Sequence, residues 1–159
     1  MKKNIRLVLL GEFILFLFTF LFTMFQINGD LSSIYSFIDL PTLILIMLIF
    51  IPGLLIMGEW KNFIRSFSVG IKTYSLLELK NILAAVIAAQ RLVIFGSLFS
   101  MITALIILLG RLDPPSAIGP YLAVSLLSGF YGVVLEFFLF PLRLNAESRM
   151  NEEMDFGDE

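Results

Sequence analysis

The sequence lacks cysteine and histidine entirely and holds few charged residues. Without cysteine the chain can form neither a disulfide nor a thiolate metal site. Without histidine it lacks the side chain that most often serves as a general base or metal ligand near neutral pH. Charged residues make up 15% of the 159 positions, well below their share in soluble domains. We therefore expect no enzyme activity, no cofactor, no metal centre and no nucleic-acid partner.

Apolar residues are what the sequence has in excess, at 58% of the chain. They gather into four stretches that are each long enough to cross a bilayer, because a helix rises about 1.5 Å per residue and the hydrocarbon core is about 30 Å thick. The first stretch is longer than the apolar part of a signal peptide, so we predict an uncleaved helix. The predicted fold class is all-α, an integral membrane protein whose four spans lie within residues 1–145. These spans are residues 7–27, 40–57, 92–109 and 118–142.

The basic residues divide unevenly between the two sides of the predicted spans. Ten of the eleven lie on one side, and only Arg111 lies on the other. Such an excess of lysine and arginine marks the cytoplasmic side of short membrane loops. Both termini and the segment 59–91 are therefore predicted to be cytoplasmic. Residues 146–159 are predicted to form a solvated acidic tail, because six of the thirteen acids fall within them.

The predicted cytoplasmic segment 59–91 has a helical pattern in two parts. An apolar stripe opposite a basic one is formed by Trp60, Phe63, Ile64, Phe67 and Ile71. This stripe suits either a helix packed on its neighbours, which we favour, or a helix that lies on lipid. Residues 76–89 then lead into the third span with no helix breaker. The third helix is therefore predicted to extend several turns into the cytoplasm.

The outer connection between the third and fourth spans reads DPPSAIGP and predicts a stiff hinge. Asp113, Pro114 and Pro115 end the third helix, because proline cannot continue the hydrogen-bond ladder and restricts the residue before it. Ser116 can then cap the fourth helix. Pro120 falls in the first turn of that helix, where its missing N–H costs nothing.

Small and polar residues gather on one face of each of the last two spans. On the fourth span, at 100° per residue, these are Ser125, Ser128, Gly129, Gly132 and Glu136. On the third span they are Gly96, Ser100 and Thr103. Such faces allow close helix approach within one chain, and they can equally line a hydrated path. We assign Gly96, Ser125, Gly129 and Gly132 to helix packing. We assign Ser100, Thr103, Ser128 and Glu136 to an ion path or a partner-facing surface.

Two carboxylates, Glu12 and Glu136, lie inside predicted spans. A carboxylate in hydrocarbon costs at least about 2.5 kcal/mol, so such residues usually face protein or water. Counted from Arg6 and Arg143, both lie about 10 Å inside the cytoplasmic boundary. For Glu12 we favour snorkelling or pairing with a basic residue at the interface. For Glu136, on the small-residue face, we favour a functional or inter-helix role.

At this point the sequence shows a resemblance to a known family. The stretch LDPPSAIGPYLAVSLLSGFYGVVLEFFLFPLRL, residues 112–144, resembles the last helix of the MotA branch of the MotA/TolQ/ExbB proton-channel family, with its DPSAxGPxxAxxLLTTxYG pattern and a proline at the cytoplasmic end. The stretch FIDLPTLILIMLIFIPGLLIMGEWKNFIRSF, residues 37–67, is similar to the second helix of that branch. The resemblance implies a subunit of the bacterial inner membrane that forms a homo-pentamer. Such a ring encloses the single transmembrane helix of a MotB, ExbD or TolR-like partner.

The chain also departs from that branch. Only about 34 residues separate the second span from the third, whereas the MotA cytoplasmic region is far longer. The paired threonines of the last helix are replaced by Ser128 and Gly129, and no proline occurs between Pro52 and Pro114. These differences favour a minimal relative over a full flagellar stator.

The resemblance predicts a ring subunit of a proton- or sodium-driven motor or energy-transducing complex. In that family the ion-accepting aspartate belongs to the single-span partner, so this chain would supply the hydroxyl-lined surface around it. The alternative is a non-conducting structural or assembly subunit that scaffolds a membrane complex. In the conducting hypothesis a proton or sodium ion is the transported species. Neither hypothesis implies a bound cofactor.

Overall fold

The computed structural model describes residues 5–28, 32–110 and 118–157, and no β-strand occurs among them. The order of elements is α1 (Ile5–Asn28), the 3₁₀ helix η1 (Ser32–Phe37), α2 (Leu40–Ile56), α3 (Trp60–Ser66), α4 (Leu76–Leu109) and α5 (Ile118–Gly157). Within these described ranges, four helices are long and apolar enough to cross a membrane, as a multi-pass membrane protein requires. The all-α prediction with four apolar spanning helices is confirmed to that extent.

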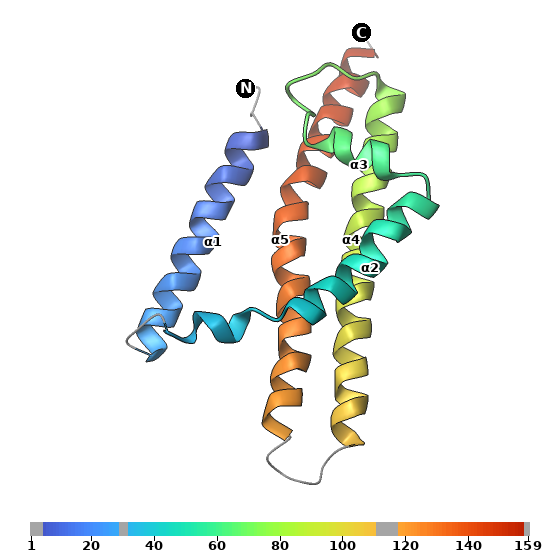
Figure 1. Cartoon of the computed structure of the whole chain (residues 1–159). Helices are drawn as coiled ribbons and strands as arrows, with labels where there is room; N and C mark the ends of the chain where they lie inside the picture. Colours follow the sequence, from blue (N-terminus) through green and yellow to red (C-terminus); the bar gives the residue numbers. More distant parts are fainter. Residues whose placement is uncertain (1–4, 29–31, 111–117, 158–159) are drawn as a thin grey trace.

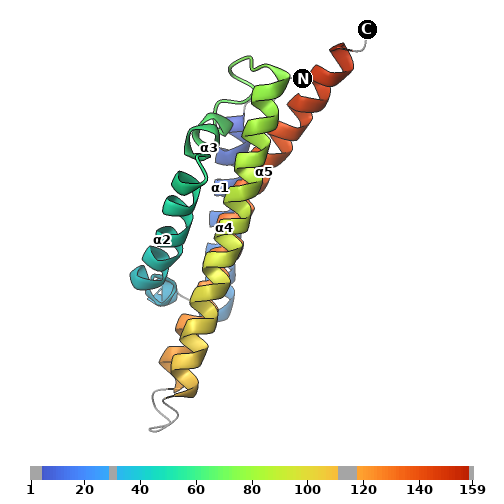
Figure 2. The ribbon, with the colours of Figure 1, turned by 90° about the vertical axis from the view of Figure 1, so that its right-hand side faces the viewer.

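Helices α4 and α5 form an antiparallel hairpin that runs the length of the molecule (Figures 1 and 2). They contain 34 and 40 residues, which corresponds to about 51 and 60 Å. Both exceed the thickness of a bilayer. Helix α2 lies across the hairpin, and α1 stands on the other side of α5 from α4 (Figure 1). The hairpin is therefore the element on which the rest of the chain packs.

The start of α4 is fixed by a capping box. Ser75 is the N-cap, its hydroxyl accepts the Glu78 N–H at 3.4 Å, and the Glu78 carboxylate accepts the Ser75 N–H at 3.1 Å. Two of the unpaired N–H groups at this helix end are satisfied in this way. Glu78 also pairs with Arg65 of α3 at 3.5 Å. As a result α4 begins sixteen residues before the predicted third span and continues through it without a break.

A left-handed glycine ends α2. Met57 is the C-cap, and Gly58 follows it with φ of 73°. The Gly58 N–H donates to the Leu55 carbonyl at 3.1 Å, and the Glu59 N–H donates to the Leu54 carbonyl at 2.9 Å. This pair of bonds is the Schellman motif, which needs a residue with positive φ after the C-cap. It turns the chain from α2 into α3.

Helix α3 is shorter than the sequence pattern indicates. It ends at Ser66, so Phe67 and Ile71 do not continue its apolar stripe, and the chain turns at Gly70 with φ of 91°. Phe63 is buried, with its ring 5.6 Å from that of Phe50 in α2. This part of the segment therefore packs on its neighbours, in agreement with the interpretation that the sequence favoured.

Helix α1 is attached to α5 mainly through phenylalanine rings. Phe16 lies 5.8 Å from Phe138 and 6.3 Å from Phe137, measured between ring centroids, and Phe13 lies 6.3 Å from Phe138. The outward faces of α1 remain exposed, and Phe18 keeps 67% of its surface accessible. Few residues of α1 are buried.

Helix α5 continues through the region that the sequence assigns to an acidic tail. It reaches Gly157, and Ala146 within that region is fully buried. Ala146 packs in a small cluster with Val69, Leu79 and Ile82. The larger core lies nearby, where α1, α2, α3, α4 and α5 meet. Its buried members are Ile5, Phe50, Leu54, Phe63, Ala85, Val86, Ala89, Val93, Leu139 and Leu142.

The first described residue of α1, helix α3 and the last turns of α5 all lie at one end of the bundle (Figure 1). The last turn of α4 and the first turn of α5 lie at the opposite end (Figure 1). Asp113, Pro114 and Pro115 lie outside the described residues, whereas Pro120 occupies the first turn of α5.

Candidate functional site

Hydroxyl groups of α4 and α5 meet where the two helices touch. Ser100 Oγ lies 3.0 Å from Ser128 Oγ, and both side chains are buried. Ser128 also donates to the Val124 carbonyl of its own helix at 3.0 Å. Since a hydroxyl carries one hydrogen, Ser100 is then the donor between the two serines. Two candidate ion-path residues thus form an inter-helix hydrogen bond within one chain.

Glycine and serine bring the two backbones close together on either side of this pair. A Cβ added at Gly132 would lie 2.6 Å from the Ser97 Cβ, closer than real Cβ contacts come. Ser125 Oγ donates to the Met101 carbonyl at 3.4 Å. At Gly129 an added Cβ would make only an ordinary contact, 3.7 Å from Met101 Sδ. Of the two glycines, Gly132 is therefore the one that the close approach requires.

Glu136 is held at this contact by an amide of α4. Gln90 Nε2 donates to Glu136 Oε1 at 2.5 Å, and Gln90 is only 4% exposed. The other carboxylate oxygen, Oε2, is shielded from solvent and has no hydrogen-bond partner among the described residues. Among those residues Glu136 forms no ion pair with Arg143. We name the whole set the α4–α5 seam: Gln90, Ser97, Ser100, Ser125, Ser128, Gly132 and Glu136.

The predicted face of the third span is divided between two neighbours. Gly96 faces α2, because a Cβ there would lie 3.5 Å from the Ile46 carbonyl oxygen. Ser100 faces α5 instead. Thr103 reaches neither, since its hydroxyl donates to the Phe99 carbonyl of its own helix at 2.8 Å at an exposed position. An ion-path role for Thr103 and Ser100 stays a prediction.

Glu12 lies apart from the seam. It lines a cavity between α1 and α5 together with Phe140 and Pro141, which are four and five residues beyond Glu136 along α5. One of its oxygens, Oε2, is also shielded from solvent without a partner among the described residues. The two intramembrane carboxylates therefore occupy different interfaces of α5.

Sequence reasoning missed the amide that binds Glu136. Gln90 stands just before Arg91, at the point where the predicted cytoplasmic segment meets the third span. A buried amide in an apolar helix needs a polar partner. The amide itself was a usable signal, but its partner 46 residues away depends on how α4 and α5 align.

A tyrosine clasp was also missed. Tyr131 of α5 donates its hydroxyl to the Phe37 carbonyl at 2.7 Å and accepts the Asp39 N–H at 2.6 Å. Asp39 is the N-cap of α2, but its carboxylate bonds to the Thr42 hydroxyl and not to a backbone N–H. The clasp ties the start of α2 to the middle of the apolar part of α5.

Within the described residues, no group of three or more acidic, histidine or cysteine side chains is placed to hold a metal ion. No family model, curated protein or solved structure matches this chain. The seam and the carboxylates therefore have to be interpreted from their own chemistry.

Proposed function

We propose that this chain is the ring subunit of a proton- or sodium-driven membrane complex. Several copies, five by the family resemblance, surround the single transmembrane helix of a partner that carries the ion-accepting aspartate. The long α4–α5 hairpin is the element suited to line such a ring, because α1 and α2 both pack on it and would then lie on the side that faces away from the ring centre. A non-conducting scaffold is the second candidate function.

The observation that carries the proposal is the incomplete hydrogen bonding of the Glu136 carboxylate. One of its oxygens is held by Gln90, while the other is shielded and has no partner among the described residues. A carboxylate in an apolar environment normally faces protein or water. Glu136 lies three residues beyond the end of an exposed apolar stripe on α5, formed by Leu122, Leu126 and Val133. In the ring this stripe would face another helix, and Glu136 would then meet either a neighbouring chain or a hydrated path.

The scaffold alternative is supported by the serines of the seam. Ser97, Ser100, Ser125 and Ser128 are all buried in the contact between α4 and α5. Each has a hydrogen-bond partner within the same chain. In the single chain these hydroxyls therefore serve helix packing, which needs no ion flow.

Glu136→Gln tests the two functions against each other. Glutamine keeps the size and the hydrogen-bonding capacity of the side chain but removes the titratable group. If the ring conducts through this site, the variant should assemble normally while ion flux in proteoliposomes with the partner falls by about tenfold or more. If Glu136 only supports assembly, oligomer yield should fall instead and flux per complex should stay at the wild-type level. Wild-type values in both measurements would contradict the proposed site.

The matched control is Glu153→Gln, which removes a carboxylate from an exposed position on the same helix, outside the predicted spans. It should leave both assembly and flux unchanged. Equal loss of flux in the two variants would point to a general surface-charge effect and would contradict a specific role for Glu136.

The proposed orientation places both termini in the cytoplasm. Because the chain has no cysteine, single cysteines can be introduced without a background. Cysteines at Ser33 and Ser116 should react with an impermeant thiol reagent from the periplasmic side, and a cysteine at Ser75 should not. The reverse labelling pattern would contradict the orientation.

A further inference from the structure

Exposed cations from three different helices lie in one layer of the bundle. Phe63 of α3, Ala89 of α4 and Leu142 of α5 belong to the same buried core, which extends about 12 Å along α4, from Ala85 to Val93. Each cation lies within two residues of one of these core residues and is exposed. We name the three cations the basic belt: Lys61, Arg91 and Arg143. No single stretch of the sequence brings them together.

Each cation of the basic belt has an exposed apolar side chain one helical turn away on the same face. The pairs are Lys61 with Ile64, Arg91 with Phe95, and Arg143 with Phe140. The three apolar side chains keep 51%, 61% and 51% of their surface accessible. On α4 and α5 the aromatic ring lies deeper in the predicted span than the cation. Each pair therefore offers a charge to a lipid head group and an apolar surface to the acyl chain.

The carboxylates near this layer are less exposed than its cations. Four carboxylates lie near it, and all are half-buried: Glu12, Glu59, Glu136 and Glu147. Glu136 binds Gln90 inside the contact between α4 and α5. Glu59 accepts a hydrogen bond from the Asn62 amide at 2.9 Å. The outward surface of the layer is therefore mainly positive.

Helix α3 is suited to the surface of a bilayer at this depth. It runs across the hairpin (Figure 1) and begins four residues after α2 ends. The end of α2 exposes Ile56 by 86% and Met57 by 55%, which is stable in lipid, so the bilayer surface lies just beyond these residues. Phe63 is buried, while Lys61 and Ile64 are exposed. A helix with such faces lies in the plane of the membrane interface.

We propose that the basic belt binds anionic phospholipids of the adjoining leaflet. The lipid phosphate lies against a cation, and the acyl chain packs on the apolar side chain one turn away. Anionic lipids are favoured over zwitterionic ones, because the ammonium or choline group of a zwitterionic head group is repelled by the same cations. The inference does not rest on ion conduction and would hold equally for a non-conducting scaffold.

The test reconstitutes the full chain in phosphatidylcholine vesicles that contain a trace of spin-labelled lipid, either phosphatidylglycerol or phosphatidylcholine. Electron paramagnetic resonance measures the fraction of each labelled lipid that the protein immobilises, and hence the ratio of their affinities. A basic residue near an anionic head group favours binding by about fivefold. The wild type should show a ratio of about five in favour of phosphatidylglycerol. The triple variant Lys61→Gln, Arg91→Gln and Arg143→Gln should lower it to about one.

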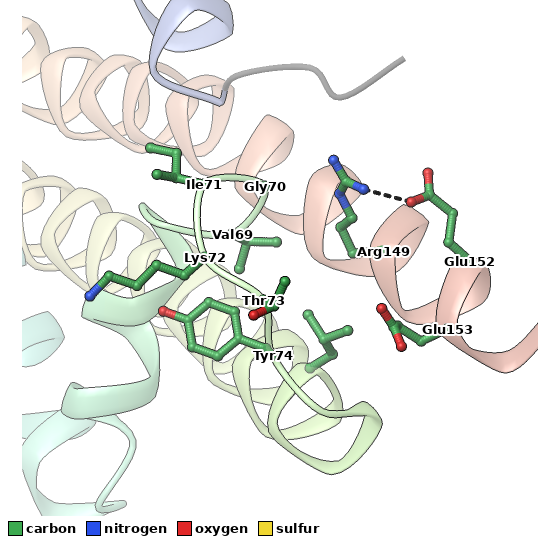
Figure 3. A pocket seen from close by; sticks show the side chains of 10 residues that line it. Val69, Gly70, Ile71, Lys72, Thr73, Tyr74, Arg149, Glu152 and Glu153 are labelled. Carbon is green, nitrogen blue, oxygen red and sulfur yellow. Dashed lines mark hydrogen bonds and ion pairs between the residues drawn. The ribbon is translucent and has the colours of Figure 1, made fainter. Parts of the chain in front are cut away.

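Lys72→Gln is the matched control, because it removes an exposed lysine further from the spans. Lys72 lines a cavity of about 450 Å³ together with Arg149, which is six residues beyond Arg143, or about 9 Å along α5. Figure 3 shows the Lys72 side chain extending away from the Glu153 carboxylate. The control should keep the wild-type ratio. An equal loss in both variants would mean that only net charge matters and would contradict the basic belt.

Two measurements do not depend on the folding of the glutamine variant. The variant Lys61→Arg, Arg91→Lys and Arg143→Lys keeps the three charges and should keep the lipid ratio. In about 1 M salt, where the Debye length is about 3 Å, the ratio of the wild type should fall to about one. A ratio that is insensitive to salt would overturn the proposal.

The depth of α3 is tested with single cysteines, since the chain has none of its own. A spin label on Ile64→Cys should collide with oxygen dissolved in the lipid, and a label on Thr73→Cys should collide with a water-soluble nickel complex. Shielding of the Ile64→Cys label from both reagents would show that a second copy of the chain covers α3. That result, or a wild-type lipid ratio of about one, would overturn the proposal.

Discussion

Helix α5 makes two very different contacts inside the apolar part of the chain. Against α4 it presents glycine and serine, and the backbones approach so closely that Gly132 has no room for a Cβ beside Ser97. Against α1 it presents the rings of Phe137 and Phe138, whose centroids lie about 6 Å from that of Phe16. The first contact is tight and polar, and the second is wide and aromatic.

The difference follows from the solvent. Within a bilayer, lipid tails are as apolar as leucine, so helices associate through close packing and hydrogen bonds. Small residues permit the close approach, and the Ser100–Ser128 bond then forms across it. Phenylalanine rings fill space but hold the helices apart. We therefore expect the hairpin to be the stable unit and α1 the part that moves first.

The same difference decides what happens to the two carboxylates. Glu136, at the tight contact, is reached by Gln90 from the neighbouring helix. Glu12, at the wide contact, lies beside a cavity and has no hydrogen bond at its shielded oxygen among the described residues. One carboxylate is bound by a side chain of the neighbouring helix, and the other lies beside an open cavity.

The largest expected effect comes from breaking the tight contact. Gly132→Ala places a Cβ against the Ser97 side chain, and such overpacking costs about 1–3 kcal/mol. The free energy of unfolding, followed by circular dichroism in increasing SDS, should fall by that amount. The double variant Gly132→Ala with Ser97→Gly should recover most of the loss, because it removes the atoms that clash.

Gly129→Ala is the matched control one turn away, where the added methyl makes an ordinary contact with Met101. It should change the free energy of unfolding by less than about 0.5 kcal/mol. Because alanine favours a helix more than glycine does, neither variant should lose stability through helix propensity. If both alanine variants were equally destabilised, the close approach at Gly132 would not be the cause.

A smaller loss should follow from removing the amide of the seam. Gln90→Leu leaves Glu136, a half-buried residue with one shielded oxygen, without its hydrogen bond, which costs about 1–2 kcal/mol. Adding Glu136→Leu should restore stability, because the unpaired carboxylate is then gone. SDS unfolding of the two single variants and the double variant gives the coupling energy, and a value near zero would contradict the contact.

The long helices were predictable because length and apolar composition alone require them. The ends of these helices were less predictable. Residues 146–159 were predicted to form a solvated tail because of their acids, yet Ala146 and Met150 continue the apolar spacing that faces α4. Counting acidic residues along the sequence drew attention away from the apolar residues, which recur at every fourth position. The capping box at Ser75 and Glu78 was likewise present in the sequence as S-x-x-E.

The sequence predicted which residues of α4 and α5 share a helical face, but not which helix each of them contacts. The helical wheel places Gly96, Ser100 and Thr103 on one face, but α4 touches both α2 and α5, and this face falls between them. Helical periodicity predicts in which direction around the helix axis a side chain points. It does not predict which neighbouring helix packs on that side. The Gln90–Glu136 and Tyr131–Phe37 contacts depend on how separate helices align along their axes, which no local pattern specifies.

The tyrosine clasp should contribute less than the seam. Tyr131→Phe keeps the ring and removes the hydrogen bonds to Phe37 and Asp39, each worth about 0.6 kcal/mol in a membrane. The hairpin should lose about 1 kcal/mol or less. Hydrogen exchange measured by mass spectrometry should show faster exchange at the start of α2. Unchanged exchange there would mean that the clasp does not hold the helix end.

The smallest effect on the hairpin should come from weakening the wide contact. Phe16→Ala removes a ring that packs on Phe137 and Phe138, and aromatic pairs of this kind contribute about 0.5–1.5 kcal/mol. That loss should fall on the attachment of α1, while SDS unfolding of the α4–α5 hairpin shifts by less than about 0.5 kcal/mol. Spin labels on α1 and α5 should report a broader distance distribution. Phe18→Ala is the control, because Phe18 lies on the exposed face of α1 and should leave the distances unchanged. If Phe16→Ala destabilised the hairpin as much as Gly132→Ala, α1 would be part of the same cooperative unit, and the distinction between a tight and a wide contact would fail.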